Sequence, residues 1–342
     1  MSIRIGISGF GRIGRNIFRI GCNQPDLQFV AVSDVADLES LAYLLKHATI
    51  EGAFSEEVRI EGNHLVCGTQ RMRYVKESTP GVIPWDVLGV DLVMECTGRF
   101  RSRSSLESHL EAGAKKVLLS TPPLDEIDRT IINGVNEGEL RPEDRIVSNG
   151  SSSSHALGLM IKVLHDAVGV ERAMMTTVHA YTGDQQLSDA ARPGLRWSRS
   201  AAQNIIPNES WAPGAVARMI PGLEGKLKGI ALNVPVAAGS NIDLTAQLKK
   251  KLSVAEVNAI LREAAEGRYR GLVGYTEDPI VSSDVIGNFC SAVIDSSATM
   301  ATGCAMVKVL GWFDNGWAYA ARMLELARLM VYGQGDESGV LR

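Results

Sequence analysis

Hydrophobic and polar positions in the first half of the chain alternate between strand-like and helix-like periods. Apolar runs predict strands at residues 3–8, 29–32, 92–94 and 117–119, and helical spacing predicts helices at 12–22 and 38–45. This alternation is typical of an α/β fold with a doubly wound parallel sheet, in which helices connect neighbouring strands.

The pattern changes after about residue 148. Longer strand candidates at residues 172–181, 229–236 and 242–248 are interspersed with helices, which predicts a second domain of the α+β class. Apolar residues recur at helical spacing over residues 317–332 and predict a helix there. A chain of 342 residues is long enough to bury a core in each of two domains.

Charge and hydropathy limit the kinds of partner. A net charge of −4 gives no broad positive field that would hold a nucleic acid or an anionic membrane surface. The chain enters a strand pattern at once, and its apolar runs stop short of the roughly 18 residues that a membrane span requires. We therefore expect a cytoplasmic protein with a small-molecule substrate, and neither a nucleic-acid partner nor a membrane partner.

The five cysteines are Cys22, Cys67, Cys96, Cys290 and Cys304. Their number is odd and they lack paired CxxC spacing, so neither a disulfide framework nor a zinc site is indicated. We expect reduced, partly buried thiols and no metal.

A glycine-rich turn follows the first predicted strand and opens the first helix, with the sequence Gly9-Phe10-Gly11-Arg12-Ile13-Gly14. Glycines at this spacing permit a tight turn and a close approach of the backbone to a pyrophosphate at the helix N-terminus. Asp34 follows the second strand, twenty residues after Gly14 (34 minus 14), where a carboxylate can bind ribose hydroxyls. A surface turn with an unrelated aspartate is the alternative, but the order of strand, turn, helix and acid favours a dinucleotide site.

Two further segments have both a structural and a catalytic interpretation. Small hydroxyl residues at 148–154 precede a helical pattern, where they can be helix caps or can surround backbone N–H groups that stabilise an oxyanion or a thiolate. Residues 174–182 predict a strand that carries His179 near its end, and a lone histidine is more often structural than catalytic. The residue pattern alone leaves both interpretations open.

Ordered sequence blocks over almost the whole chain resemble the phosphorylating glyceraldehyde-3-phosphate dehydrogenase family, which includes the erythrose-4-phosphate dehydrogenases. The blocks are GFGRIGR at 9–15, SDVAD at 33–37, AYLLKH at 42–47, ECTGRF at 95–100, GAKKVLLSTP at 113–122, SNGSSSSH at 148–155, TVHAYTGDQ at 177–185, QNIIP at 203–207, GKLKGIALNVP at 225–235 and GWFDN at 311–315. The resemblance implies a Rossmann-type dinucleotide-binding domain over residues 1–150 and an α+β catalytic domain over 151–317. It also implies a C-terminal helix at 318–335 that packs back on the first domain, and a homotetramer.

The resemblance also implies roles for individual residues. Arg12 and Ile13 would lie along the pyrophosphate with the glycine turn, Asp34 would bind the adenosine ribose, and Asn315 would hold the nicotinamide carboxamide. The cofactor cleft would be lined by Thr97 and Ser120. The catalytic positions would be Ser152 and His179, with the substrate contacted by Ser151, Ser153, Thr182 and Asn233.

Position 152 departs from the family, whose S-N-A-S-C-T-T-N motif has a nucleophilic cysteine there. A thiolate attacks an aldehyde readily near neutral pH, and a serine hydroxyl is far less acidic, so we expect this form to have impaired activity. Ser152 is either an engineered replacement made to trap a complex or a natural serine. Ser153, Ser154 and His155 replace Thr, Thr and Asn of the motif, which favours a diverged branch.

The phosphate-binding positions also depart from the family. Residues 208–213 read NESWAP in place of T-T-T-G-A-A, and Asn233 replaces an arginine. Phosphates bind through cations and backbone N–H groups, and Glu209 would repel them, although Arg192, Arg196 and Arg199 lie nearby in the sequence. We therefore expect an NAD-dependent aldehyde oxidoreductase whose substrate differs from glyceraldehyde 3-phosphate.

Two alternatives remain for the activity and one for the cofactor. The chain can be a non-catalytic, cofactor-binding pseudoenzyme, or a dehydrogenase that transfers hydride directly without a covalent intermediate. NADP is the alternative to NAD, because Ala190-Ala191 replaces the family's leucine-proline pair and Arg192, which follows, can meet a 2′-phosphate.

Overall fold

The computed structural model describes residues 2–303 and 305–333, and these form two compact units. Among the described residues, unit 1 comprises 2–131, 137–151 and 319–333, and unit 2 comprises 132–136, 152–303 and 305–318. Each unit has a mixed sheet and its own hydrophobic core.

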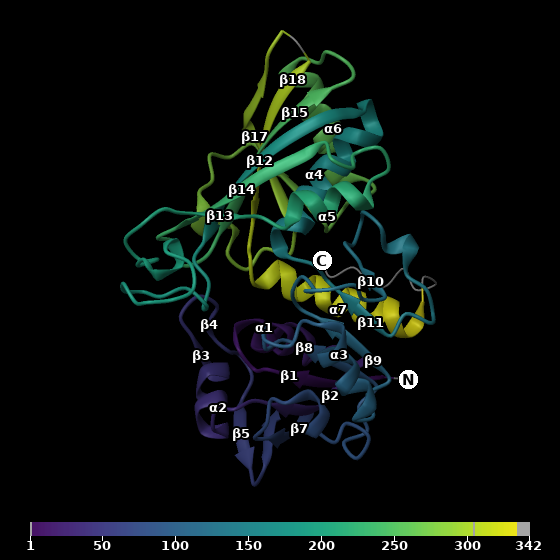
Figure 1. Ribbon diagram of the computed structural model, residues 1–342, viewed down its shortest axis with the longest axis vertical. Helices are drawn as coiled ribbons and strands as arrows, with labels where there is room; N and C mark the ends of the chain where they lie inside the picture. The colour runs from purple at the N-terminus through teal and green to yellow at the C-terminus, as the bar shows by residue number, and fades with distance from the viewer. Residues whose placement is uncertain (1, 304, 334–342) are drawn as a thin grey trace. The chain divides into compact units, whose positions relative to one another are not determined.

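Unit 1 contains a nine-stranded sheet in the order β10-β11-β9-β8-β1-β2-β7-β6-β5 (Figure 1). Its strands are β1 (Ile3–Ser8), β2 (Leu27–Ser33), β5 (Val58–Glu61), β6 (His64–Cys67), β7 (Gln70–Val75), β8 (Leu92–Glu95), β9 (Lys116–Leu119), β10 (Arg129–Thr130) and β11 (Ile146–Ser148). Pairs from β10 to β7 are parallel, and β7, β6 and β5 pair antiparallel. The predicted doubly wound parallel sheet is confirmed from β10 to β7. The antiparallel strands β6 and β5 at one edge were not predicted.

Apolar residues of the central strands and the helices form the core of unit 1. The helices are α1 (Arg12–Gly21), α2 (Leu38–Lys46), α3 (Arg103–Glu111) and α7 (Trp317–Tyr332), with the short elements β3 (His47–Ala48), β4 (Gly52–Ala53), η1 (Pro80–Val82) and η2 (Glu137–Glu139). The last helix contributes Met323 and Leu324 to the same cluster as Ile5 and Ile7. The helix predicted at 318–335 extends to positions 334 and 335, which lie outside the described residues.

Unit 2 contains a seven-stranded sheet in the order β13-β14-β12-β15-β18-β17-β16. Its strands are β12 (Val170–Ala180), β13 (Ile206–Glu209), β14 (Leu227–Val234), β15 (Ser240–Leu248), β16 (Val273–Thr276), β17 (Ala292–Ala301) and β18 (Met306–Phe313). Its helices are α4 (Ser152–Val168), α5 (Ala212–Met219), α6 (Val254–Glu266), η3 (Arg196–Ser198) and η4 (Ser282–Val285). The predicted α+β class is confirmed for this unit.

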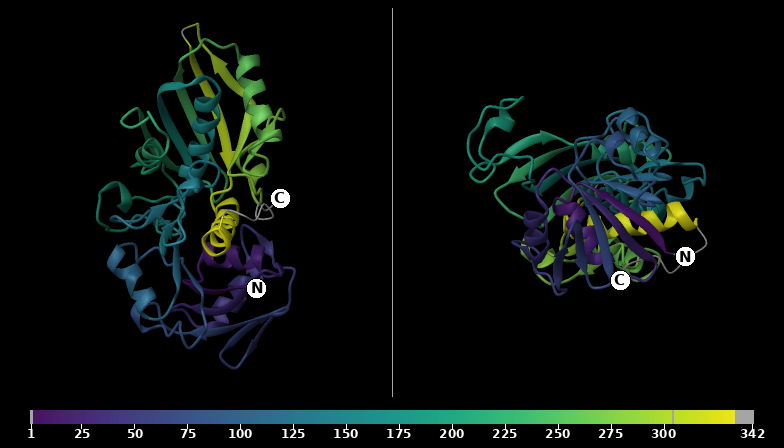
Figure 2. Two further views of the ribbon diagram at one scale, coloured as in Figure 1. Left: turned by 90° about the vertical axis from the view of Figure 1, so that its right-hand side faces the viewer. Right: turned by 90° about the horizontal axis from the view of Figure 1, so that it is seen from below.

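Alternate residues of the unit 2 strands face a layer of helices. Along β15 every second residue is buried, because α4 packs across the middle of this sheet (Figures 1 and 2). Helix α5 packs on β14, and α6 packs on β16 and β17. The three helices cover one face of the sheet, and the other face is more open.

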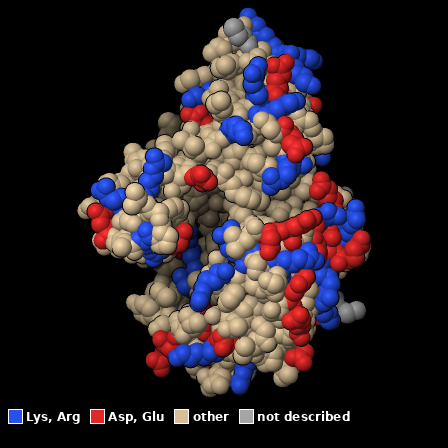
Figure 3. All heavy atoms as spheres, in the orientation of Figure 1, with Lys and Arg blue, Asp and Glu red and all other residues tan. Residues whose placement is uncertain are grey.

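Surface charge is mixed. Basic and acidic side chains are interspersed on the face drawn in Figure 3. No helix within residues 2–303 and 305–333 has the length and apolar character needed to cross a membrane. In the same part of the chain, no three His, Cys, Asp or Glu side chains gather as metal ligands would.

Candidate functional site

The turn between β1 and α1 places three glycines in different surroundings. Gly9 has a φ of 89°, and a Cβ atom there would lie 2.7 Å from the backbone nitrogen of Thr97. A Cβ on Gly14 would lie 2.4 Å from the carbonyl oxygen of Gly9. Gly11, the N-cap of α1, has no neighbouring atom within 4 Å of such a Cβ. The turn is therefore closed on its protein side and open at Gly11, which fits a pyrophosphate at the helix N-terminus.

The Asp34 side chain connects this turn to the loop after β2 through two hydrogen bonds. Its Oδ2 accepts a hydrogen bond from the Phe10 backbone N–H at 2.7 Å, and its Oδ1 accepts one from the Ala36 N–H at 3.0 Å. The side chain is half-buried, and each carboxylate oxygen has a further lone pair for a ribose hydroxyl. Arg12 and Ile13 are half-buried in the first turn of α1. The structure thus brings these predicted cofactor residues together.

Thr97 and Ser120 follow two neighbouring strands of the same sheet. The Thr97 N–H donates to Glu95 Oε1 at 2.8 Å, and the Ser120 N–H donates to the Glu95 carbonyl oxygen at 3.0 Å. Because β8 and β9 are parallel to β1, both residues lie at the carboxyl edge that carries Gly9. Doubly wound sheets bind their ligands at this edge.

Ser152 and His179 belong to unit 2. Ser152 is the first residue of α4, and His179 lies near the carboxyl end of β12, on which α4 packs. The His179 Nδ1 atom lies 2.6 Å from the Ala180 carbonyl oxygen. A carbonyl oxygen only accepts, so Nδ1 carries the proton, and Nε2 of the neutral ring is an acceptor. Such a ring can act as a general base.

The segment before Ser152 is held within unit 1. The Ser148 hydroxyl donates to the Thr121 carbonyl oxygen at 2.7 Å and accepts from the Gly150 N–H at 2.9 Å. The Tyr319 hydroxyl donates to the Gly150 carbonyl oxygen at 3.1 Å. Ser151 and Ser153, on either side of Ser152, are half-buried.

Neutral side chains occupy the strand position beside His179. Asn233 of β14 pairs in register with His179, and its Nδ2 donates to Gln185 Oε1 at 3.0 Å. The same Gln185 oxygen accepts from the Thr182 N–H at 3.1 Å, and Asn208 donates to Asn233 Oδ1. The amide chain formed by Asn208, Asn233 and Gln185 carries no charge.

Arginines of the segment after Thr182 bind backbone oxygens. Arg192 Nη1 donates to the Asp184 carbonyl oxygen at 2.7 Å, and Arg196 Nη1 donates to the Pro207 carbonyl oxygen at 3.3 Å. Both arginines are exposed, so water screens their charge. These contacts hold the segment together.

Asn315 lies in the turn between β18 and α7. Asp314 fixes this turn, because its Oδ1 accepts from the Gly316 and Trp317 N–H groups, both at 2.7 Å. The Asn315 side chain is buried, and among the described residues neither its Oδ1 nor its Nδ2 has a hydrogen-bond partner. An unfilled donor beside an unfilled acceptor matches the carboxamide of a nicotinamide ring.

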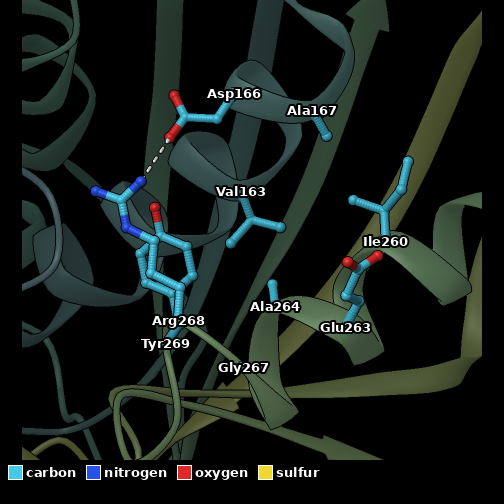
Figure 4. Close-up of a pocket in the computed structure, with 9 residues that line it drawn as sticks. All are labelled: Val163, Asp166, Ala167, Ile260, Glu263, Ala264, Gly267, Arg268 and Tyr269. Atoms are coloured by element: carbon cyan, nitrogen blue, oxygen red, sulfur yellow. Dashed lines mark ion pairs between the residues drawn. The ribbon is translucent and has the colours of Figure 1, made fainter.

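A hollow of about 380 Å³ opens at the other end of α4. Asp166 and Arg268 form an ion pair at 3.9 Å across one wall, and Ile260 lies on the opposite side (Figure 4). Asp166 is four helical turns from Ser152, roughly 20 Å along the axis. The hollow is therefore separate from the candidate active site.

Cys22, Cys67 and Cys96 are free thiols. Burial raises the pKa of Cys22 to about 11 and the pKa of Cys67 to about 12, and burial followed by the Glu95 charge raises the pKa of Cys96. Thiols with raised pKa values are poor nucleophiles at neutral pH. Cys304 lies outside the described residues.

Several residues of the site have no clear signal in the sequence. The side chains of Glu95, Gln185 and Asn208 bind predicted residues, and Asp314 holds the turn that carries Asn315. Of these four, only Asn208 falls outside the blocks that resemble the family. Trp85 donates to His109, which in turn contacts Glu95, and neither Trp85 nor His109 follows a recognisable spacing.

Comparisons with known proteins match both halves of the chain to one family. Residues 3–103 match the profile described as "Glyceraldehyde 3-phosphate dehydrogenase, NAD binding domain", and residues 151–315 match the corresponding C-terminal domain. The chain is 45% identical over 332 residues to glyceraldehyde-3-phosphate dehydrogenase 2 of Streptomyces arenae, covering 96% of this chain and 99% of the relative. It is 44% identical over 328 residues to the enzyme of the same name from Geobacillus stearothermophilus, covering 96% and 98%.

These matches confirm the predicted fold class. They also confirm NAD as the cofactor, because the matched N-terminal profile is that of the NAD-binding domain and it includes the glycine turn and Asp34.

Proposed function

Because the chain belongs to the glyceraldehyde-3-phosphate dehydrogenase family, we propose that it is an NAD-dependent aldehyde oxidoreductase whose substrate is not glyceraldehyde 3-phosphate. The observation that carries this proposal is the amide chain of Asn208, Asn233 and Gln185, of which Asn233 pairs in register with His179. Neutral amides do not compensate a phosphate dianion, and Glu209 on the adjoining strand is an anion.

The residue at position 152 carries the covalent step in this proposal. His179 Nε2 accepts the proton of the position 152 side chain as that side chain attacks the aldehyde carbon, and later exchanges a proton with the substrate oxygen. The N-terminus of α4 stabilises the developing negative charge. When bound, NAD supplies the hydride acceptor, and Asn315 orients its carboxamide.

Ser152 weakens this chemistry. A hydroxyl loses its proton less readily than a thiol, and an oxygen ester is a poorer intermediate for transfer to phosphate than a thioester. Whether the serine is engineered or natural, we infer that this form turns over slowly or stops after binding. A cofactor-binding pseudoenzyme is the alternative favoured by Ser152, and direct hydride transfer is the alternative favoured by the Nε2 acceptor of His179.

We assign the roles of the other site residues from the resemblance to the family. Cofactor contacts are assigned to the glycine turn, Asp34, Thr97, Ser120 and Asn315, and substrate contacts to Ser151, Ser153, Thr182 and Asn233. We further propose a dinucleotide-binding domain at 1–150 with the helix 318–335, and a catalytic domain at 151–317.

We also propose a cytoplasmic homotetramer. The open face of the unit 2 sheet exposes Met174 and Ile230, which are 70% and 49% accessible, on the adjacent strands β12 and β14. Leu195 on the segment before β13 is 92% accessible. Exposed apolar side chains of this kind suit contact between copies of the chain.

Restoring the family's arginine at position 233 tests the proposal about the substrate. In a Ser152→Cys background, Asn233→Arg should raise kcat/KM for glyceraldehyde 3-phosphate relative to glyceraldehyde by about 10- to 100-fold, the size of a charge-assisted contact. Asn233→Leu removes the amide without adding charge and should show no such gain. The proposal is wrong if the Ser152→Cys protein already prefers the phosphorylated aldehyde strongly, before any change at position 233.

A further inference from the structure

Three side chains that the proposed reaction does not use form a buried chain in unit 1. Trp85 Nε1 donates to His109 Nδ1 at 3.0 Å, and His109 Nε2 lies 3.0 Å from Glu95 Oε2. All three side chains are fully buried, and they come from the segment after η1, the last turn of α3 and the end of β8. We call them the Trp85–His109–Glu95 chain.

The hydrogen bonds determine where the protons lie. An indole N–H only donates, so His109 Nδ1 must accept, and the proton of the neutral imidazole lies on Nε2. The neutral His109 ring therefore donates its Nε2–H to the Glu95 carboxylate. The Trp85 ring is fixed in turn, because it packs so closely on β1 that a Cβ atom at Gly6 would lie 2.7 Å from it.

The other Glu95 oxygen holds the turn that follows β8. Glu95 Oε1 accepts from the Thr97 backbone N–H at 2.8 Å and from the Thr97 hydroxyl. Thr97 Oγ1 accepts in turn from the Arg99 N–H at 3.1 Å. The buried carboxylate thus receives donors on both oxygens, which offsets the loss of its hydration.

Thr97 is also the residue against which the glycine turn is packed. The backbone nitrogen of Thr97 is the closest atom to the Cβ position of Gly9, at 2.7 Å. A shift of Thr97 would therefore displace Gly9, and with it the backbone N–H groups at the start of α1. Binding weakens when such groups must be ordered by the ligand itself.

We propose that the Trp85–His109–Glu95 chain positions the NAD site, by holding Thr97 against Gly9 so that the glycine turn is already in its binding conformation. The three side chains are positioning residues, since all are fully buried behind the turn.

Glu95→Gln is the sharpest variant. An amide has one oxygen, so it cannot accept from both His109 and Thr97, and one buried donor loses its partner. The Kd for NAD, measured by calorimetry, should rise about tenfold. Thr97→Val, which removes only the hydroxyl, should raise it less. The effects of the two changes should not add, because both act on the same hydrogen bonds.

Gln70→Leu is the matched control. Gln70 is a buried polar residue of the same unit, and its amide binds the Phe29 N–H at 2.9 Å and the Cys22 carbonyl oxygen at 2.8 Å. This change should lower Tm and leave the Kd for NAD unchanged. An unchanged Kd in a folded Glu95→Gln protein would mean that the chain only supports the fold, and would overturn the proposal.

A second measurement needs no variant of the chain. In the unaltered protein with ¹⁵N-labelled histidine, the His109 resonances should show a neutral ring with Nε2–H, and the Nε2–H signal should shift when NAD is added. A doubly protonated ring, or a signal that does not respond to saturating NAD, would overturn the proposal even if every variant failed to fold.

Discussion

Adding one methyl group at each of two glycines should separate the binding role of the glycine turn from its structural role. Gly11 and Gly14 lie three residues apart at the start of α1. A Cβ at Gly14 would lie 2.4 Å from the Gly9 carbonyl oxygen and 3.1 Å from Ile7, whereas a Cβ at Gly11 meets nothing within 4 Å. The methyl group at Gly14 should strain the fold, and the methyl group at Gly11 should occupy the space of the ligand.

The change at Gly14 should act on the free energy of unfolding, and the change at Gly11 should act mainly on the free energy of NAD binding. Overpacking at Gly14→Ala should cost about 1 to 3 kcal/mol of stability, which lowers Tm by roughly 3 to 10 °C for a unit of this size. At the N-cap, Gly11→Ala should cost only about 0.5 kcal/mol. The same methyl group should weaken hydrogen bonds to the charged pyrophosphate, so the Kd for NAD should rise about tenfold or more.

Calorimetric NAD titration and thermal unfolding of the variants provide the test. Gly138→Ala is the control, since a Cβ there also meets nothing within 4 Å and the residue lies in η2, away from the glycine turn. Gly138→Ala should change neither Tm nor the Kd for NAD. The placement of the pyrophosphate at Gly11 is refuted if Gly11→Ala binds NAD as tightly as the parent.

Three other predictions concern catalysis, alkaline stability and cofactor choice. In a Ser152→Cys background, His179→Gln should lower kcat about 10² to 10⁴-fold, and a loss below tenfold in stopped-flow assays would contradict its role as base. Burial raises the pKa of Cys22 from an ordinary 9.0 to about 11, so folding favours the neutral thiol, and the free energy of unfolding should fall between these pH values. Cys22→Ala should flatten that decline in urea titrations at several pH values, and an equal slope would contradict the assignment. Arg192→Ala should leave the ratio of NAD to NADP affinity unchanged, because this guanidinium binds the Asp184 carbonyl oxygen; a selective loss of NADP binding would contradict this.

Strong periodicity made much of the fold predictable. β1 coincides with the predicted residues 3–8, and α7 coincides with 317–332, because both are apolar runs that become buried. The antiparallel edge of unit 1 was missed. Three of the four residues of β5 are exposed, so burial imposes no alternating pattern on them.

The candidate site was predictable only where short motifs carry it. The glycine turn and Asp34 are close in sequence and chemically distinctive. Trp85, Glu95 and His109 are separated by ten or more residues, and only the packing of α3 and the η1 segment around β8 brings them together. The amide chain was missed in part for the same reason, because Asn208 and Asn233 meet only through the pairing of β13 with β14.

NAD reduction by the parent and by Ser152→Cys tests the central claim most directly. Both proteins are given NAD and a panel of phosphorylated and unphosphorylated aldehydes, and nicotinamide absorbance is followed. The account predicts that both bind NAD and that only the cysteine form reduces it at an appreciable rate, with a substrate other than glyceraldehyde 3-phosphate preferred. Equal rates in the two proteins, or NAD binding without reduction in either, would contradict a covalent step at position 152.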